Sequence, residues 1–122
     1  MKRDHLERSP KLYLSEIIEF IERIKEYTEG MTYEDFLKNI QVIDAVDANV
    51  RKIGEAVRVL SKNGRIRNLF YCYHIPYQKL AGMRTDLTHE YFAVSTRALW
   101  ITATRDIVNL KLQFEKVLKE LE

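Results

Sequence analysis

The sequence is poor in residues that interrupt helices and in residues that cross-link chains. Its 122 residues include 4 glycines, 2 prolines and a single cysteine, Cys72. One cysteine cannot form an intrachain disulfide, which excludes a disulfide-stabilised framework and suits a reducing compartment. The sequence has no run of about 20 apolar residues, and residues 1–9 lack the apolar stretch of a signal peptide. We therefore expect a cytoplasmic protein without a membrane partner.

Recognisable sites for metals, nucleotides and serine nucleophiles are also missing. His5 and His74 are isolated, and no cluster of Cys and His has the spacing of a zinc site. Neither of the phosphate-binding patterns G-x-x-x-x-G-K-[ST] and G-x-G-x-x-G occurs, and no G-x-S-x-G is present. We expect no metal and no cofactor.

Length and apolar content predict one domain spanning residues 1–122. Hydrophobic residues make up 46% of the chain, which is enough for one core but not for two. The 20 basic residues nearly balance the 18 acidic ones. A formal net charge of +2 says little about partners by itself.

Apolar residues recur three and four places apart in three long stretches, which predicts helices. The first should begin at Ser9-Pro10 and end at Gly30, and Thr32 with Asp35 should cap a short helix that reaches Leu37. The second should run from Gln41 to Lys62, and the third from about Ser95 to the C-terminus. Their apolar seams are Leu14, Ile17, Ile18, Ile21, Ile24; Ile43, Val46, Val50, Ile53, Val57, Leu60; and Trp100, Ala103, Ile107, Leu110, Phe114, Val117, Leu121.

The middle of the chain gives weaker signals. Asn63-Gly64 is expected to end the second long helix in a left-handed cap, and residues 64–75 look less regular. Pro76 can open a short helical turn that Gly82 ends, and a helix is predicted from Met83 to Phe92. The fold class is therefore all-α, as an up-and-down bundle of about four main helices plus short helices.

A basic and aromatic stretch, residues 56–85, contains no acidic side chain. Cations interleaved with aromatic rings suit a phosphate backbone and unstacked bases, so the stretch predicts RNA binding. The alternative is a solvated basic loop whose aromatic rings pack inward. The RNA-binding candidates are Arg65, Arg67, Lys79 and Tyr77.

The octet Arg84-Thr85-Asp86-Leu87-Thr88-His89-Glu90-Tyr91 follows directly. On the predicted helix, Arg84 and Tyr91 would stack on one face because they are seven residues apart. Asp86 lies three residues before His89, so its carboxylate could orient the imidazole. Arg84 and His89 could converge on one phosphate from adjoining faces.

Arginine and histidine together suit RNA cleavage without metal. A ribose 2′-hydroxyl attacks the adjacent phosphate, the imidazole of His89 transfers a proton near neutral pH, and the guanidinium of Arg84 stabilises the added negative charge. One histidine provides a single proton-transfer group, so two copies in a symmetric dimer would supply an acid and a base. The alternative for the isolated octet is a salt bridge and a surface imidazole.

The stretches Ala81-Gly82-Met83-Arg84 and His89-Glu90-Tyr91-Phe92 resemble the signature of the HepT branch of the HEPN superfamily: an Arg, four residues, His, any residue, then Tyr. Residues 27–32, Phe36-Leu37, Asp44-Ala45-Val46, Ile53-Gly54-Glu55-Ala56 and Ile75-Pro76 are also similar to that family. The resemblance covers roughly residues 12–118.

The resemblance implies a dimeric helical bundle that acts as a metal-independent endoribonuclease toxin of a type VII-like toxin–antitoxin system. It assigns catalytic roles to Arg84 and His89, and the neighbouring Thr85 and Asp86 are our candidates for supporting residues. It also implies a partner, an MntA-like minimal nucleotidyltransferase that neutralises the toxin by attaching AMP to Tyr91. An anionic adduct there would occupy the phosphate site.

One position departs from the family pattern. The residue after the signature arginine is commonly Asn or Asp, and here it is Thr85. This departure favours an alternative, a non-catalytic nucleotide- or RNA-binding subunit that pairs with a nucleotidyltransferase. A helical interaction module with no nucleic-acid role is a third alternative, and the stretch without acidic residues argues against it.

Overall fold

The computed structural model describes residues 9–83 and 87–122, with the backbone alone for His89. Within these ranges all regular elements are helical, which confirms the predicted all-α fold of the HEPN-like type. The elements are α1 (Pro10–Thr28), α2 (Tyr33–Leu37), α3 (Ile40–Leu60), α4 (Gly64–Cys72), α5 (Tyr77–Ala81), η2 (His89–Tyr91), α6 (Phe92–Ile101), η3 (Thr102–Ile107), η4 (Val108–Leu110) and α7 (Lys111–Glu120).

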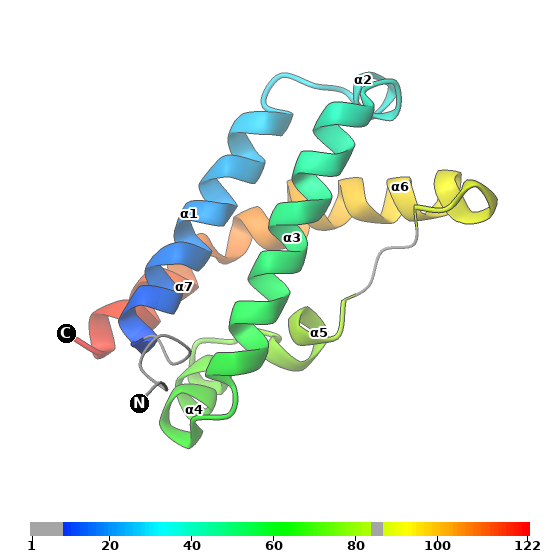
Figure 1. Cartoon of the computed structure of the whole chain (residues 1–122). Helices are drawn as coiled ribbons and strands as arrows, with labels where there is room; N and C mark the ends of the chain where they lie inside the picture. Colours follow the sequence, from blue (N-terminus) through cyan, green and yellow to red (C-terminus); the bar gives the residue numbers. More distant parts are fainter. Residues whose placement is uncertain (1–8, 84–86) are drawn as a thin grey trace, which may run out of the picture.

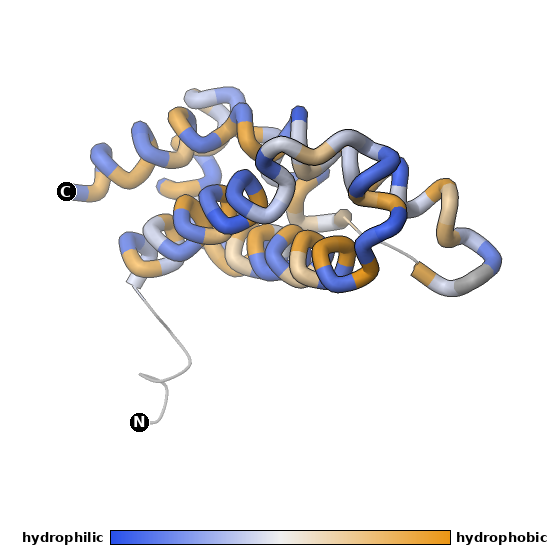
Figure 2. The backbone as a smooth tube through the Cα atoms, turned by 90° about the horizontal axis from the view of Figure 1, so that it is seen from above, coloured by the Kyte–Doolittle hydropathy of each residue, from blue (hydrophilic) through white to orange (hydrophobic). Residues whose placement is uncertain are grey.

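Helices α1 and α3 run antiparallel side by side, and α2 connects them at one end (Figure 1). The helical stretch from α6 through η3 and η4 to α7 crosses behind this pair, and α7 packs along α1. Helices α4 and α5 lie at the end of α3 opposite α2. The η2–α6 end projects beyond the α1–α3 pair in Figures 1 and 2.

The predicted helix starts are confirmed by their hydrogen bonds. The Leu12 amide donates to Ser9 Oγ at 3.1 Å, and Pro10 occupies the first turn. At α2 the Asp35 amide donates to Thr32 Oγ1 at 3.1 Å, while the Thr32 amide donates to Asp35 Oδ2 at 3.0 Å. Gly30 has a φ of 76°, a left-handed conformation that glycine adopts without strain. These caps act within one helical turn, so local sequence suffices to predict them.

Two predictions for the middle of the chain were wrong. Asn63 does not form a left-handed cap: its φ is −86°, and its side chain accepts a hydrogen bond from the Ile66 amide at 3.1 Å. It is therefore the N-cap of α4, and Gly64 is the first residue of that helix. The stretch expected to be irregular is helical up to Cys72 because Ile66 and Phe70 lie four residues apart and are both buried.

The predicted C-terminal helical stretch is present, but it starts earlier than predicted and is not a continuous α-helix. It begins at Phe92 rather than near Ser95, and the π-helical turn η3 and the 3₁₀ turn η4 interrupt it before α7. Thr104 Oγ1 donates to the Trp100 carbonyl at 2.7 Å within this interruption. A π turn changes the direction of the side chains that follow it, which allows α6 and α7 to contact different parts of the bundle.

The core lies between α1, α3 and the C-terminal stretch. The predicted seams are buried except for Ile18, Trp100, Leu110 and Leu121, which are partly buried. Phe36, Phe70 and Phe114 are the largest fully buried side chains of the core. Phe70 meets Phe114 edge to face, with ring centroids 6.0 Å apart, and Trp100 packs on Phe36 at 5.0 Å. In the described part of the chain, no helix is both long enough and apolar enough to span a bilayer.

Candidate functional site

The signature segment, residues 84–91, connects α5 to α6. The candidates Arg84, Thr85 and Asp86 lie outside the described residues, as does the side chain of His89. The backbone of His89 begins the 3₁₀ turn η2, and Tyr91 ends it. Tyr91 is 51% exposed and precedes the first turn of α6.

The helix predicted from Met83 to Phe92 is wrong for the residues of this range that the structure describes. Leu87 and Thr88 are not helical, and Thr88 has an extended backbone with φ −65° and ψ 160°. The Tyr91 amide donates to the Thr88 carbonyl at 3.1 Å, which starts the helical stretch anew. Because the backbone is not helical at Leu87 and Thr88, helical periodicity does not support the predicted pairs Arg84–Tyr91 and Asp86–His89. Arg84, Asp86 and the His89 side chain themselves lie outside the described residues.

Apolar side chains in and beside the signature segment pack against the core. Met83, Leu87 and Phe92 are partly buried against the core. Tyr91 and Val94 point away from it, and Val94 is 74% exposed. The projecting end of the molecule therefore presents an exposed aromatic ring and an exposed aliphatic side chain beside the signature segment.

A close helix contact positions α5, which leads into the signature segment. A Cβ atom placed on Gly54 of α3 would lie 2.8 Å from the Leu80 carbonyl oxygen of α5. Only glycine allows the two backbones to approach so closely. The family-like stretch Ile53-Gly54-Glu55-Ala56 thus has a structural reason for its glycine.

Polar side chains on α3 were missed by the sequence reasoning. Asp47 and Asn49 are buried, Arg51 Nε donates to Asp47 Oδ2 at 2.8 Å, and Asn49 Nδ2 donates to the Ala45 carbonyl at 2.8 Å. Asp47 precedes Gly54 by seven residues, so it shares the α3 face that meets α5. The sequence signal that could have revealed this site was an acidic residue, Asp47, on a helix face otherwise rich in valine and isoleucine.

The four RNA-binding candidates divide into two pairs. Arg65 Nη2 donates to the Glu120 carbonyl at 3.2 Å, and Arg67 Nη1 donates to the Ser61 carbonyl at 3.0 Å. Both arginines are exposed on α4, and each guanidinium has this backbone partner. Tyr77 and Lys79 lie together on α5, where each lines a surface hollow.

A further contact ties α4 to the C-terminal end of α7. The Tyr73 hydroxyl donates to Glu120 Oε2 at 2.6 Å. This hydrogen bond is the main reason that the pKa of Tyr73 is raised, with desolvation adding to it. The Tyr73 hydroxyl therefore keeps its proton and donates a hydrogen bond to Glu120. This contact holds the end of α4 against the end of α7.

Two hollows flank α5. The first, of about 780 Å³, is lined by Tyr71, Cys72, His74, Ile75, Pro76, Tyr77, Gln78 and Lys79. The second, of about 330 Å³, is lined by Pro76, Lys79, Leu80, Met83, Thr102, Arg105, Asp106, Asn109 and Leu110. Met83 immediately precedes Arg84, so the second hollow reaches the start of the signature segment.

Metal-binding groups do not gather in the described ranges: no three His, Cys, Asp or Glu side chains lie close enough to hold an ion. The features near the signature segment are instead an exposed tyrosine, exposed cations and aromatic rings. These groups can bind phosphates and bases.

Several known proteins that are named as ribonucleases are similar to this chain over almost its full length. The chain is 44% identical over 116 residues to a Thermococcus cleftensis protein named "Probable ribonuclease HepT", covering 93% of this chain and 100% of the relative. It is 39% identical over 115 residues to a Methanocaldococcus jannaschii protein named "Putative RNase", covering 94% of this chain and 92% of the relative. A Caldanaerobacter subterraneus protein, also named "Putative RNase", is 34% identical over 113 residues, covering 93% of this chain and 97% of the relative.

No solved structure gave a significant match to the chain. The model of the family described as ribonuclease HepT-like matches residues 17–117, a span that includes α3, α5 and the whole signature segment. The family resemblance noted from the sequence is thereby confirmed, and the chain belongs to the ribonuclease HepT-like family.

Proposed function

We propose that the protein is a metal-independent endoribonuclease and the toxin of a type VII-like toxin–antitoxin pair. The observation that carries this proposal is the pattern Arg84-x₄-His89-x-Tyr91, which lies within the span matched by the ribonuclease HepT-like family. The exposed, projecting position of Tyr91 supports it, because an RNA strand or a modifying enzyme can approach this end from solvent.

The reaction uses the ribose 2′-hydroxyl as its nucleophile. The 2′-oxygen bonds to the adjacent phosphorus, the bond from phosphorus to the 5′-oxygen breaks, and a 2′,3′-cyclic phosphate and a 5′-hydroxyl result. His89 transfers the proton as base or as acid, because an imidazole titrates near neutral pH. Arg84 stabilises the negative charge that builds on the phosphorane through paired N–H donors.

We further propose that the active form is a homodimer. One imidazole cannot be base and acid in the same step, and a two-fold axis beside the signature segment would bring two copies of His89 together. The exposed side chain of Val94 at the projecting η2–α6 end supports an interface there.

The proposed antitoxin is an MntA-like minimal nucleotidyltransferase that transfers AMP to the Tyr91 hydroxyl. The 51% exposure of Tyr91 supports this assignment, since the acceptor hydroxyl has to enter another enzyme's site. The adenylate would add negative charge and bulk two residues from His89, where the RNA phosphate has to bind.

The proposal is tested by expressing wild type and His89→Ala in a bacterial host and by incubating both purified proteins with RNA in excess chelator. We expect wild type to arrest growth and to cut RNA to 2′,3′-cyclic phosphate ends. His89→Ala should lower the cleavage rate by at least about 100-fold, the lower range for loss of a general acid or base.

His5→Ala serves as the matched control, because His5 lies outside the signature, and it should cut like wild type. A single 2′-deoxynucleotide should block cleavage at its own position. Full activity of His89→Ala, or cleavage at the 2′-deoxy position, would rule out the proposed chemistry.

A second candidate function rests on Thr85, which stands where the family commonly has Asn or Asp. In this case the chain is a non-catalytic nucleotide- or RNA-binding subunit of a nucleotidyltransferase. The same experiment separates the two: a harmless wild type that leaves RNA intact and binds the nucleotidyltransferase tightly would favour the second function.

A further inference from the structure

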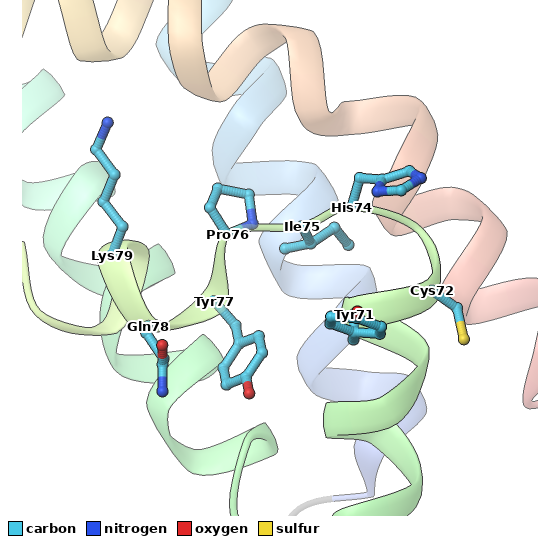
Figure 3. Close-up of a pocket in the computed structure, with 8 residues that line it drawn as sticks. All are labelled: Tyr71, Cys72, His74, Ile75, Pro76, Tyr77, Gln78 and Lys79. Carbon is cyan, nitrogen blue, oxygen red and sulfur yellow. The ribbon is translucent and has the colours of Figure 1, made fainter.

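Two tyrosine rings border the larger hollow beside α5. Tyr71, at the end of α4, and Tyr77, at the start of α5, lie on either side of it, with Ile75 and Pro76 behind (Figure 3). We call these four residues the tyrosine slot. Nothing in the RNA-cleaving mechanism uses it, and the side chain of Tyr71 is 76% exposed.

The local fold explains why the two rings face one space. The chain reverses after α4 at His74, which has a left-handed φ of 59°. The Ile75 amide then donates to the Phe70 carbonyl at 2.8 Å, which brings the start of α5 back beside the end of α4. The ring of Tyr77 packs on Phe70 with centroids 6.1 Å apart, so one wall is anchored in the core and the other is exposed.

The charges around the tyrosine slot favour an anionic ligand. None of the eight residues that line the hollow is acidic, and Lys79 and His74 lie on its edge. Arg67 precedes Tyr71 by four residues on α4, but its guanidinium donates to the Ser61 carbonyl on the side away from the ring, so Lys79 is the lysine or arginine that lines this hollow. Aromatic faces with nearby cations are the usual means of binding unpaired bases together with their phosphates.

The larger hollow shares two lining residues with the second hollow, which reaches the residue before the signature segment. Pro76 and Lys79 line both hollows, and the second hollow continues past Arg105 to Met83. In Figure 3 the Lys79 side chain points away from the two rings. Asp106 also lines this second hollow, where its carboxylate is paired with Arg105 Nε at 3.3 Å.

We propose that the tyrosine slot binds an unpaired nucleobase of RNA between Tyr71 and Tyr77, while Lys79 holds a phosphate of the strand that continues along the second hollow toward Met83. This inference rests on the proposed ribonuclease function and names a second contact for its substrate. The slot selects single-stranded RNA, because only an unpaired base can leave its neighbours and enter between the rings.

Binding is measured by fluorescence anisotropy in the His89→Ala background, with a single-stranded RNA of about ten nucleotides, within the site sizes of such proteins. Tyr71→Ala should weaken binding by about 5-fold to about 150-fold, the range expected for one stacked base. Tyr71→Trp should restore it. The matched control is Tyr27→Ala, an exposed tyrosine near the α1–α2 end of the molecule, which should bind like the parent.

An RNA of the same length with abasic riboses should bind the parent more weakly and should not respond to Tyr71→Ala. Unchanged RNA binding by Tyr71→Ala would overturn the proposal, and so would an equal loss for natural and abasic RNA. A cleavage assay then separates this inference from the proposed function: Tyr71→Ala should slow cleavage of the RNA of about ten nucleotides but not of a dinucleotide. If wild type cuts neither substrate, the ribonuclease proposal fails, and the binding measurements alone then show whether the tyrosine slot binds a base.

Discussion

At the residue scale, Tyr91 differs from Arg84 and His89 because the structure describes both its backbone and its side chain. Its backbone ends the η2 turn, its side chain is half exposed, and it lies two residues after His89. The resemblance assigns its hydroxyl as an acceptor of AMP rather than as a catalytic group. Removing only that oxygen therefore separates modification from cleavage.

Tyr91→Phe should abolish modification and leave RNA cleavage within about 3-fold of wild type, since the exposed ring is retained and no catalytic proton is lost. The measurement is intact mass after incubation with an MntA-like nucleotidyltransferase and ATP, followed by RNA cleavage. Tyr27→Phe is the control and should still gain AMP. Addition of AMP to the Tyr91→Phe protein would place the modification elsewhere.

At the scale of elements, the contact between α3 and α5 determines where the signature segment begins. Gly54 lets the Leu80 carbonyl approach within the space that a Cβ atom would fill. Because the helix backbones are rigid and closely packed, an added methyl group has to displace α5 or bend α3.

Gly54→Ala should lower the free energy of unfolding by about 1–3 kcal/mol, the usual cost of overpacking. RNA cleavage should fall as well, since the chain passes from α5 through Met83 into the signature segment. Denaturant unfolding and a cleavage assay measure the two effects. Gly64→Ala is the matched control: an added Cβ there meets only the end of the Arg67 side chain at 3.7 Å, and stability should change by less than about 0.5 kcal/mol. Equal effects of the two substitutions would contradict the role given to the α3–α5 contact.

At the scale of the whole molecule, an ion pair joins the first long helix, α1, to the last, α7. Lys111 Nζ of α7 lies 2.6 Å from Glu22 Oε2 of α1, and both side chains are about one third exposed. This hydrogen bond is the main cause that lowers the pKa of Glu22 below its ordinary value of 4.5 and raises that of Lys111 above 10.5. A lowered carboxyl pKa stabilises the fold above the unfolded value, and the contribution is lost as the pH falls through the folded value.

Glu22→Gln should therefore lower the Tm at neutral pH, and its difference from wild type should shrink as the solution is acidified below pH 4.5. The shift should be small and should decrease in high salt, because the pair is accessible to solvent. Thermal unfolding followed by circular dichroism measures it. Glu19→Gln, which removes a more exposed pair with Arg23 within α1, should shift the Tm less. A difference from wild type that stays constant down to acid pH would show that Glu22 does not act through its charge.

The sequence by itself determined the helical class, the caps at Ser9 and Thr32, the three apolar seams and the family pattern around His89. These signals act within one or two turns, so neighbouring residues contain them completely. Tertiary structure decided where helices stop and which side chains meet. Burial of Phe70 made α4 a helix, and the extended backbone of Thr88 delayed the start of the next helical turn to His89. The close approach of Gly54 to Leu80 and the hollow that Tyr71 and Tyr77 share depend on contacts between elements, which helical periodicity does not specify.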